Sequence, residues 1–232
     1  NLAYKKLTAT TNDRFELNDK SAHRLPFKKD LSESIREALV NCLMHAYYDF
    51  DSPIVITAYN DFYEFKNPGK MKISIPEFIH GGTSKTRNGT ISSLFRRIGM
   101  SEKAGSGGPK IFDVSEKYKL KIPEVSTTFD STIVTIWKVD LLSSYQDVTQ
   151  DERAILKYII ENESISKNDV IDNNLMTEYK FRENLKTLQS KQYIEVIGKG
   201  RSTKYVLPRT SSEQYHIIKQ KIKNLGDFMT KN

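Results

Sequence analysis

Apolar residues recur at three- and four-residue spacing over residues 31–48, a period that predicts an amphipathic helix. β-branched and aromatic residues then predict two strands, over 54–59 and 62–66, that pair as a hairpin. Polar residues without a period occupy 81–89, which indicates a mobile loop. The later elements predicted in this half are helices over 90–98 and 110–118 and strands over 124–129 and 132–138. The first half of the chain is therefore predicted to be an α+β domain.

The pattern changes after a polar stretch over residues 141–149. Three helices are then expected, over 151–162, from an N-cap at Ser166, and from an N-cap at Thr177 to about 192. Strands over 193–197 and 203–207 complete the order of a winged helix-turn-helix. We expect two domains, 1–142 and 143–232. The second is expected to end in an amphipathic helix over 212–228 that packs on its own domain or on a second copy.

Length and composition narrow the class of protein. The chain has 232 residues, enough for two small domains, and a single cysteine, Cys42, which excludes an internal disulfide. No apolar run approaches the roughly 18 residues of a membrane-spanning helix, and the amino terminus has no signal-peptide pattern. We therefore expect a cytoplasmic protein without a membrane partner. Because the chain begins at Asn1 rather than Met, we expect a fragment of a longer protein.

Positive charge is concentrated in the second half of the chain. The net charge is +7, and residues 180–223 contain 11 Lys and Arg against 3 Asp and Glu. A helix that reads the major groove buries one face and shows donors on the other, while cations at a hairpin tip can meet phosphates. The candidate DNA-binding residues are Lys180, Arg182, Lys186, Lys191, Lys199, Arg201 and Lys204. A dimerisation or protein-docking module is the alternative for this half.

Three polar residues share one face of the helix over 31–48. Glu37, Asn41 and His45 are four residues apart, opposite the apolar stripe. An amide oxygen can ligate Mg²⁺, and a carboxylate can act as a general base on water. A polar, solvent-facing helix surface is the alternative interpretation.

A glycine cluster precedes the helix over 110–118. Gly105-Ser106-Gly107-Gly108 leads into Pro109, which suits a first helical turn, and the exposed N–H groups there attract phosphate. Lys110 follows proline and precedes Ile111, so the cluster is not a Walker A loop. A plain turn is the alternative for this cluster taken alone.

Together these motifs resemble the ATP-binding carboxy-terminal domain named after RecG-like proteins, a member of the GHKL ATPase group. The resemblance rests on Arg36-Glu37-Ala38-Leu39-Val40-Asn41 with His45, on Asn67-Pro68-Gly69, Arg87-Asn88 and Glu102, and on Gly105-Ser106-Gly107. It implies an α/β sandwich of the GHKL type fused to a winged helix, with Glu37 as general base and Asn41 as Mg²⁺ ligand. It also implies Gly105, Ser106 and Gly107 as the phosphate loop and Asn67 as acceptor for the adenine amino group. His45, Gly69, Arg87 and Asn88 complete the nucleotide-binding residues that the resemblance implies.

The expected function is a transcriptional regulator that binds ATP and Mg²⁺ in its first domain and DNA in its second, within a homodimer. Weak ATPase activity is left open, and a helicase is set aside because this chain has no Walker A motif. The alternative function is a degenerate scaffold, in which the first domain serves only dimerisation or interaction.

Overall fold

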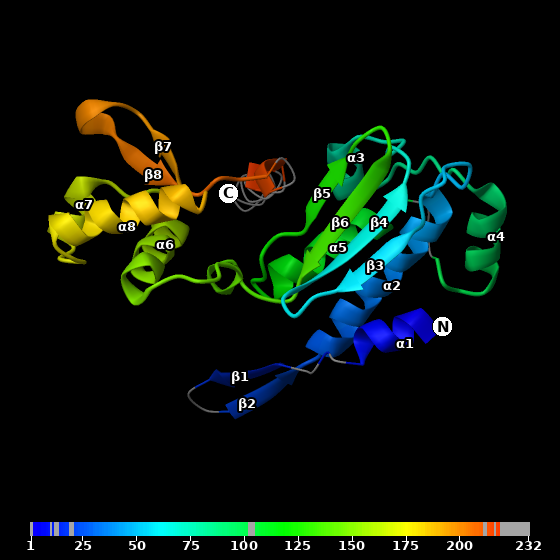
Figure 1. Ribbon diagram of the computed structural model, residues 1–232. Coiled ribbons are helices and arrows are strands. Elements are labelled where there is room, and N and C mark those ends of the chain that lie inside the picture. The colour runs from blue at the N-terminus through cyan, green and yellow to red at the C-terminus, as the bar shows by residue number, and fades with distance from the viewer. Residues whose placement is uncertain are drawn as a thin grey trace, which may run out of the picture. The chain divides into compact units, whose positions relative to one another are not determined.

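The computed structural model describes residues 2–9, 11, 14–18, 21–101, 105–210, 213–215 and 217–218. The chain divides into two compact units (Figure 1). The first consists of Asn1–Val139 together with Ser211–Asn232, and the second of Asp140–Thr210. The second unit is thus an insertion between two segments of the first. None of the helices in the described ranges has the length and apolar character needed to span a membrane.

The first unit is α+β, with a four-stranded antiparallel sheet in the order β3-β4-β6-β5. Figure 1 shows helices α2 and α5 on one face of this sheet. The unit contains α1 (Leu2–Thr8), β1 (Arg14–Asn18), β2 (Ser21–Leu25), α2 (Phe27–His45), β3 (Val55–Ala58), β4 (Phe62–Pro68), α3 (Ile75–His80), α4 (Gly89–Arg97), α5 (Gly107–Lys117), β5 (Glu124–Thr127) and β6 (Ser131–Trp137). β1 and β2 pair only with each other, as a separate antiparallel hairpin.

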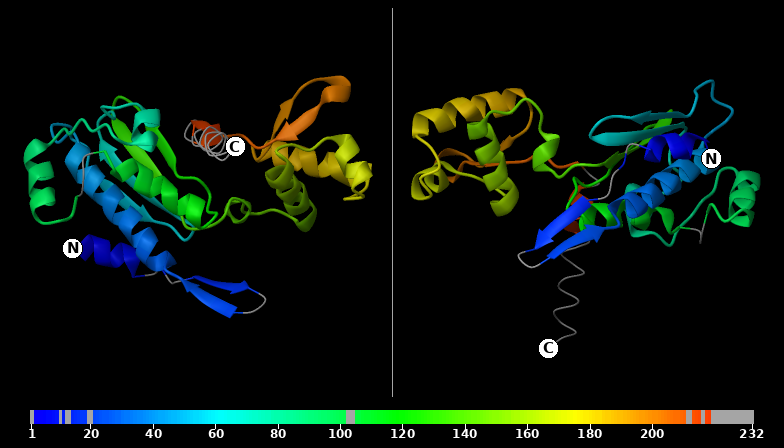
Figure 2. Two further views of the ribbon diagram at one scale, coloured as in Figure 1. Left: turned by 180° about the vertical axis from the view of Figure 1, so that it is seen from behind. Right: turned by 90° about the horizontal axis from the view of Figure 1, so that it is seen from below.

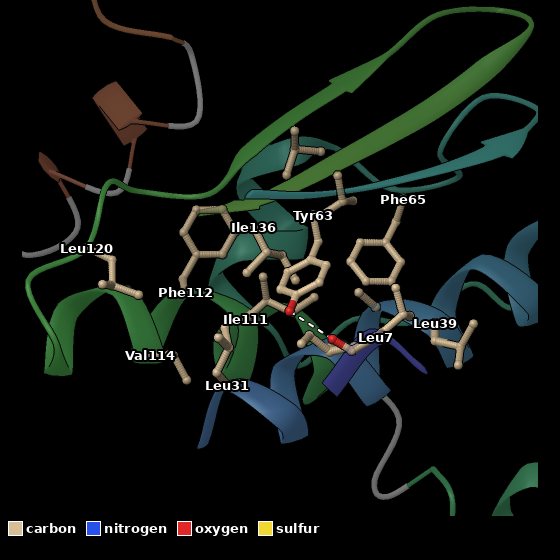
Figure 3. Close-up of a cluster of buried hydrophobic side chains, with 14 of the residues drawn as sticks. Leu7, Leu31, Leu39, Tyr63, Phe65, Ile111, Phe112, Val114, Leu120 and Ile136 are labelled. Carbon is tan, nitrogen blue, oxygen red and sulfur yellow. Dashed lines mark hydrogen bonds between the residues drawn. The ribbon is translucent and has the colours of Figure 1, made fainter. Parts of the chain in front are cut away.

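The core of the first unit lies between the sheet and α2 and α5 (Figure 3). Alternation along β4 turns Tyr63 and Phe65 inward, where they face Ile136 and Val134 of β6 in register. The buried Tyr63 hydroxyl donates to the carbonyl of Leu7, at 2.9 Å, and so ties α1 to the sheet. Burial of such large side chains supplies most of the driving force that holds the layers together.

Several boundaries differ from those predicted. Helix α2 begins at Phe27 and ends at His45, because Ala46 adopts an extended backbone with ψ of 141°. Helix α5 begins at Gly107, so two of the clustered glycines belong to the helix itself. Three elements were not predicted at all: α1, the β1–β2 hairpin, and α3, whose N-terminus carries a reciprocal Ser74–Glu77 capping box.

The second unit contains three helices and a two-stranded hairpin, as Figure 2 shows from two further sides. Its elements are η1 (Leu142–Ser144), α6 (Gln150–Asn162), α7 (Lys167–Asp172), α8 (Glu178–Ser190), β7 (Glu195–Ile197), η2 (Gly200–Ser202) and β8 (Lys204–Val206). Thr149, Ser166 and Thr177 each accept a hydrogen bond from the third residue of the helix that they cap. A separate core joins the helices through Ile155, Leu156, Phe181, Leu185 and Leu188, among others.

The end of the chain does not follow the expected division. The structure groups Ser211–Asn232 with the first unit, whereas the sequence placed 143–232 in one domain. Glu213 is buried and Tyr215 packs against the core of the first unit. Most of the helix expected over 212–228 lies outside the described residues.

Candidate functional site

A cavity of about 130 Å³ opens beside the carboxyl half of α2. Glu37, Asn41 and His45 all line it, because residues four apart lie on one side of a helix. Four more of the predicted nucleotide-binding residues also line the cavity: Asn67, Arg87, Gly105 and Gly107. Glu37 is 6% exposed, so its face of α2 is not a solvent face. The remaining candidates, Gly69, Asn88 and Ser106, are not among the lining residues, and Glu102 lies outside the described residues.

The glycine cluster allows α5 to start directly against α2. A Cβ atom on Gly107 would collide with the Glu37 carboxylate and lie 2.9 Å from Nδ2 of Asn41. Gly105 has φ of 83°, and a Cβ atom there would lie 2.9 Å from the backbone of Gly82. Gly82 donates its N–H to the carbonyl of Gly105, at 3.0 Å. The cluster is therefore a close-packed backbone turn that brings the N-terminus of α5 to the cavity.

A row of polar side chains crosses the inner face of the sheet at the cavity. Asn67 of β4 and Thr132 of β6 face each other in register and are both buried, and Thr127 of β5 pairs with Thr132 in turn. The hydroxyls of Thr127 and Thr132 are 3.1 Å apart, and that of Thr132 donates to the carbonyl of Gly69, at 2.9 Å. Sequence reasoning missed Thr132, although the register predicted by two facing strands could have paired it with Asn67.

The loop over 81–89 is fastened at both ends. Asn88 donates its side-chain amide to the carbonyls of Met44, at 3.2 Å, and Ala46, at 2.8 Å, and so closes the end of α2. Arg87 donates to the carbonyl of Lys70, at 2.7 Å, and its guanidinium lies 5.0 Å from the ring centre of Tyr47. Gly69 lies beside the same guanidinium. The residues between these anchors, 83–86, line the cavity.

The cavity is strongly basic. Among the described residues that line it, five are Lys or Arg and one, Glu37, carries a carboxylate; the five are Lys70, Lys72, Lys85, Arg87 and Arg96. None of these five forms an ion pair within the described parts of the chain. Several like charges around one cavity repel each other, and a bound polyanion would relieve that repulsion.

His45 lies among these charges. Burial lowers the pKa of its imidazole, and the nearby Arg87 and Lys72 cations lower it further. All three causes disfavour the imidazolium form, so the folded protein holds His45 neutral at pH 7. A polyanion beside Arg87 and Lys72 would offset the two cations and raise this pKa again.

The shift at His45 makes stability depend on pH. Because its folded pKa lies below the unfolded value of about 6.5, the unfolded chain binds more protons in that window, and stability falls as pH drops below about 6.5. We expect His45→Gln to flatten this decline in urea unfolding measured between pH 5 and 7. His80→Gln, on an exposed position outside the cavity, is the control and should leave the decline as it is. If the free energies of unfolding of wild type and His45→Gln fell in parallel between pH 7 and 5, His45 would not be the cause of the decline.

The side chains at the cavity fit a hard cation poorly on their own. No group of three or more His, Cys, Asp and Glu in the described ranges could hold a metal ion. Nδ2 of Asn41 is buried without a hydrogen-bond partner among the described residues. Rotation of that amide by half a turn would place its oxygen there instead. Glu37 and Asn41 could thus supply two oxygen ligands, and Mg²⁺ usually takes the remainder from phosphates and water.

The basic residues predicted for DNA binding fall into two groups. On and next to α8, Lys180 pairs with Asp151 at 3.1 Å, Lys186 with Glu183 at 2.7 Å, and Arg182 with Glu178. Lys191 pairs with the buried Glu152 at 3.1 Å. In the hairpin, Lys199, Arg201 and Lys204 are exposed and in no ion pair with any described residue. Sequence reasoning also missed Tyr179, which is 76% exposed on the outer face of α8.

Comparison with known proteins supports an ATPase-type domain in the first unit. The sequence profile of the family described as "Putative ATP-dependent DNA helicase recG C-terminal" matches residues 51–136. A solved structure, the DIP2311 protein from Corynebacterium diphtheriae, aligns with a TM-score of 0.46 and 15% sequence identity. That alignment covers 88% of this chain and 44% of the other, so this chain spans less than half the length of that protein. No curated protein matches the chain. The similarity to the RecG carboxy-terminal family thus begins after α2 and includes the glycine cluster, the Arg87-Asn88 pair and the polar row on β4 and β6.

Proposed function

We propose that the chain is a nucleotide-responsive, DNA-binding transcriptional regulator that acts as a homodimer. In this proposal the first unit is a GHKL-type domain that binds ATP with Mg²⁺, and the second is a winged helix that binds DNA. The observation that carries it is the cavity: a carboxylate, an amide and a glycine turn converge there among five cations without ion-pair partners in the described chain. A triphosphate matches this combination of positive charge and a helix N-terminus beside the cavity.

Each side chain then has a role set by its position. The N-terminus of α5 and the cations bind phosphate oxygens, while Asn67 and Thr132 lie on the sheet floor, where they can meet the edge of a base. Glu37, which lies against Gly107, can accept a proton from a water molecule at the phosphates. Bound Mg²⁺ would supply charge neutralisation of the phosphates. A cavity of about 130 Å³ is smaller than the roughly 300 Å³ lower end of ligand sites, so this proposal includes an opening of the lining residues 83–86 when a nucleotide binds.

Calorimetry of ATP with Mg²⁺ against the wild type and Asn41→Ala tests the nucleotide site. We expect wild-type binding and at least about a tenfold loss in the variant, since removal of one charge-assisted contact costs about 1.5–3 kcal/mol. Asn60→Ala, an exposed asparagine away from the cavity, is the matched control and should bind as wild type does. Absent heats, or equal affinity in wild type and Asn41→Ala, would remove ATP from the proposal.

One observation favours a second candidate, a scaffold without ATP turnover. Glu37 is nearly buried and pressed against Gly107, which leaves little room for an attacking water. The two candidates differ in hydrolysis: steady phosphate release by the wild type that is lost in Glu37→Gln supports the enzyme. Binding of ATP without release in either protein supports the scaffold.

A further inference from the structure

The tip of the β7–β8 hairpin, residues 199–204, and the outer face of α8 differ in local charge. On the outer face of α8, the cations Lys180, Arg182 and Lys186 lie within salt-bridge distance of Asp151, Glu178 and Glu183. Glu178 also pairs with Lys167, at 2.9 Å, so these three carboxylates face four cations, and the face carries about one excess positive charge against three at the hairpin tip. Charges separated by more than about 8–10 Å are screened at physiological salt, so this local balance decides the attraction for phosphate.

The hairpin tip holds three cations and no carboxylate. Lys199, Arg201 and Lys204 are all exposed and form no ion pair with a described residue. The acidic residue of this hairpin, Glu195, lies at its other end, paired in register with Val206. A polyanion that approaches the second unit therefore meets its strongest uncompensated charge at residues 199–204.

The tip is also held in one conformation. The Ser202 hydroxyl donates to the carbonyl of Lys199, at 2.9 Å, and the Thr203 hydroxyl to that of Gly200, at 2.9 Å. Gly198 has φ of 77° and packs against the carbonyl of Ser202. Space is open around Gly200, so a phosphate backbone can approach the main chain there. Because the turn is already ordered, less conformational entropy is lost when its cations bind.

We propose that residues 199–204, and not the outer face of α8, make most of the phosphate contacts of this unit with duplex DNA. This inference rests on the proposed DNA-binding function and assigns its electrostatic part to the hairpin. The face of α8 then contributes little charge. Its exposed Tyr179, Arg182 and Glu183 offer instead the apolar, donor and acceptor groups that suit base edges.

The test compares two three-charge variants of the full chain. One combines Lys199→Ala, Arg201→Ala and Lys204→Ala; the matched control combines Lys180→Ala, Arg182→Ala and Lys186→Ala. The probe is a fluorescein-labelled 20-base-pair duplex of mixed sequence, titrated by anisotropy at several KCl concentrations. Thermal unfolding of both variants shows that each remains folded.

The slope of log affinity against log salt is the readout. If each hairpin cation contacts one phosphate, at about 0.9 per contact, the slope of the hairpin variant should be shallower than that of the wild type by about 2.7. Its affinity at 0.1 M salt should then be about 500-fold lower. The α8 variant should change the slope by less than about 1. A change in slope for the α8 variant that equals or exceeds the change for the hairpin variant would overturn the inference while leaving DNA binding intact. A wild type that does not bind the duplex at all would overturn the DNA-binding proposal as well, in favour of a protein-docking module.

Discussion

Gly108→Ala is expected to lower the free energy of unfolding by about 3 kcal/mol. A Cβ atom at this position would overlap the backbone carbonyl of Phe78 in α3. That carbonyl cannot move away easily, because the Ser74–Glu77 capping box and the Gly81 N–H bond to Glu77 hold both ends of α3. For a unit of this size the loss corresponds to a melting temperature lower by roughly 10 °C, measured by calorimetry or circular dichroism.

The control is another glycine at the start of a helix. A Cβ atom on Gly89, the first residue of α4, would meet nothing within 4 Å, and its backbone has no positive φ. Gly89→Ala is therefore expected to change stability by less than about 1 kcal/mol, with a small gain from the reduced entropy of the unfolded chain. If Gly108→Ala were as stable as Gly89→Ala, the close approach of α5 to α3 would be wrong.

Lys191→Ala is expected to lower the free energy of unfolding by about 2 kcal/mol. Its amine donates to Glu152, whose side chain is 2% exposed, and to the carbonyl of Asp147 at 2.6 Å. Loss of the cation leaves a buried carboxylate to which, among the described residues, only the N–H of Thr149 donates. Breaking a fully buried pair costs about 3–5 kcal/mol, and the expected loss is smaller here because the Lys191 side chain is 28% exposed and solvent screens its charge.

Two further variants separate this pair from ordinary surface charge. Lys180→Ala removes an exposed pair with Asp151 and should cost less than about 1 kcal/mol. The double variant Glu152→Gln and Lys191→Met should recover more than half of the loss, because no charge is then left buried. Urea unfolding measures all three. An unchanged stability in Lys191→Ala would return this lysine to the set available for DNA.

Elements with a strong hydrophobic period could be predicted from the sequence, and those without one could not. The stripe over Ile35–Ala46 predicted most of α2, and the structure shows the caps expected at Ser166 and Thr177, whereas the cap at Thr149 was not predicted. Helix α3 has only six residues, fewer than two turns, so a period could not reveal it. Its Ser74–Glu77 capping signal was present in the sequence and was overlooked.

The candidate site was predictable where its residues share one helix and unpredictable where they meet across elements. Four-residue spacing was enough to place Glu37, Asn41 and His45 on one side of α2. The position of Thr132 at the cavity depends on strand register. The five cations that line the cavity come from segments far apart in the sequence, which only the folded chain brings together. Counting charges along the sequence likewise overestimated the net positive charge near α8, because some of the carboxylates that pair with its lysines lie on another helix, α6.

Because Asp140–Thr210 lies between two segments of the first unit, two connections join the second unit to the first. One connection leaves from Val139, whose carbonyl accepts the N–H of Lys121 at 2.8 Å, and the other returns to Tyr215 on the first core. Cleavage of the chain at Asp140 would therefore leave the second unit joined to the first through the packing of the segment that contains Tyr215, whereas cleavage after Thr210 would leave the covalent connection at Val139 intact.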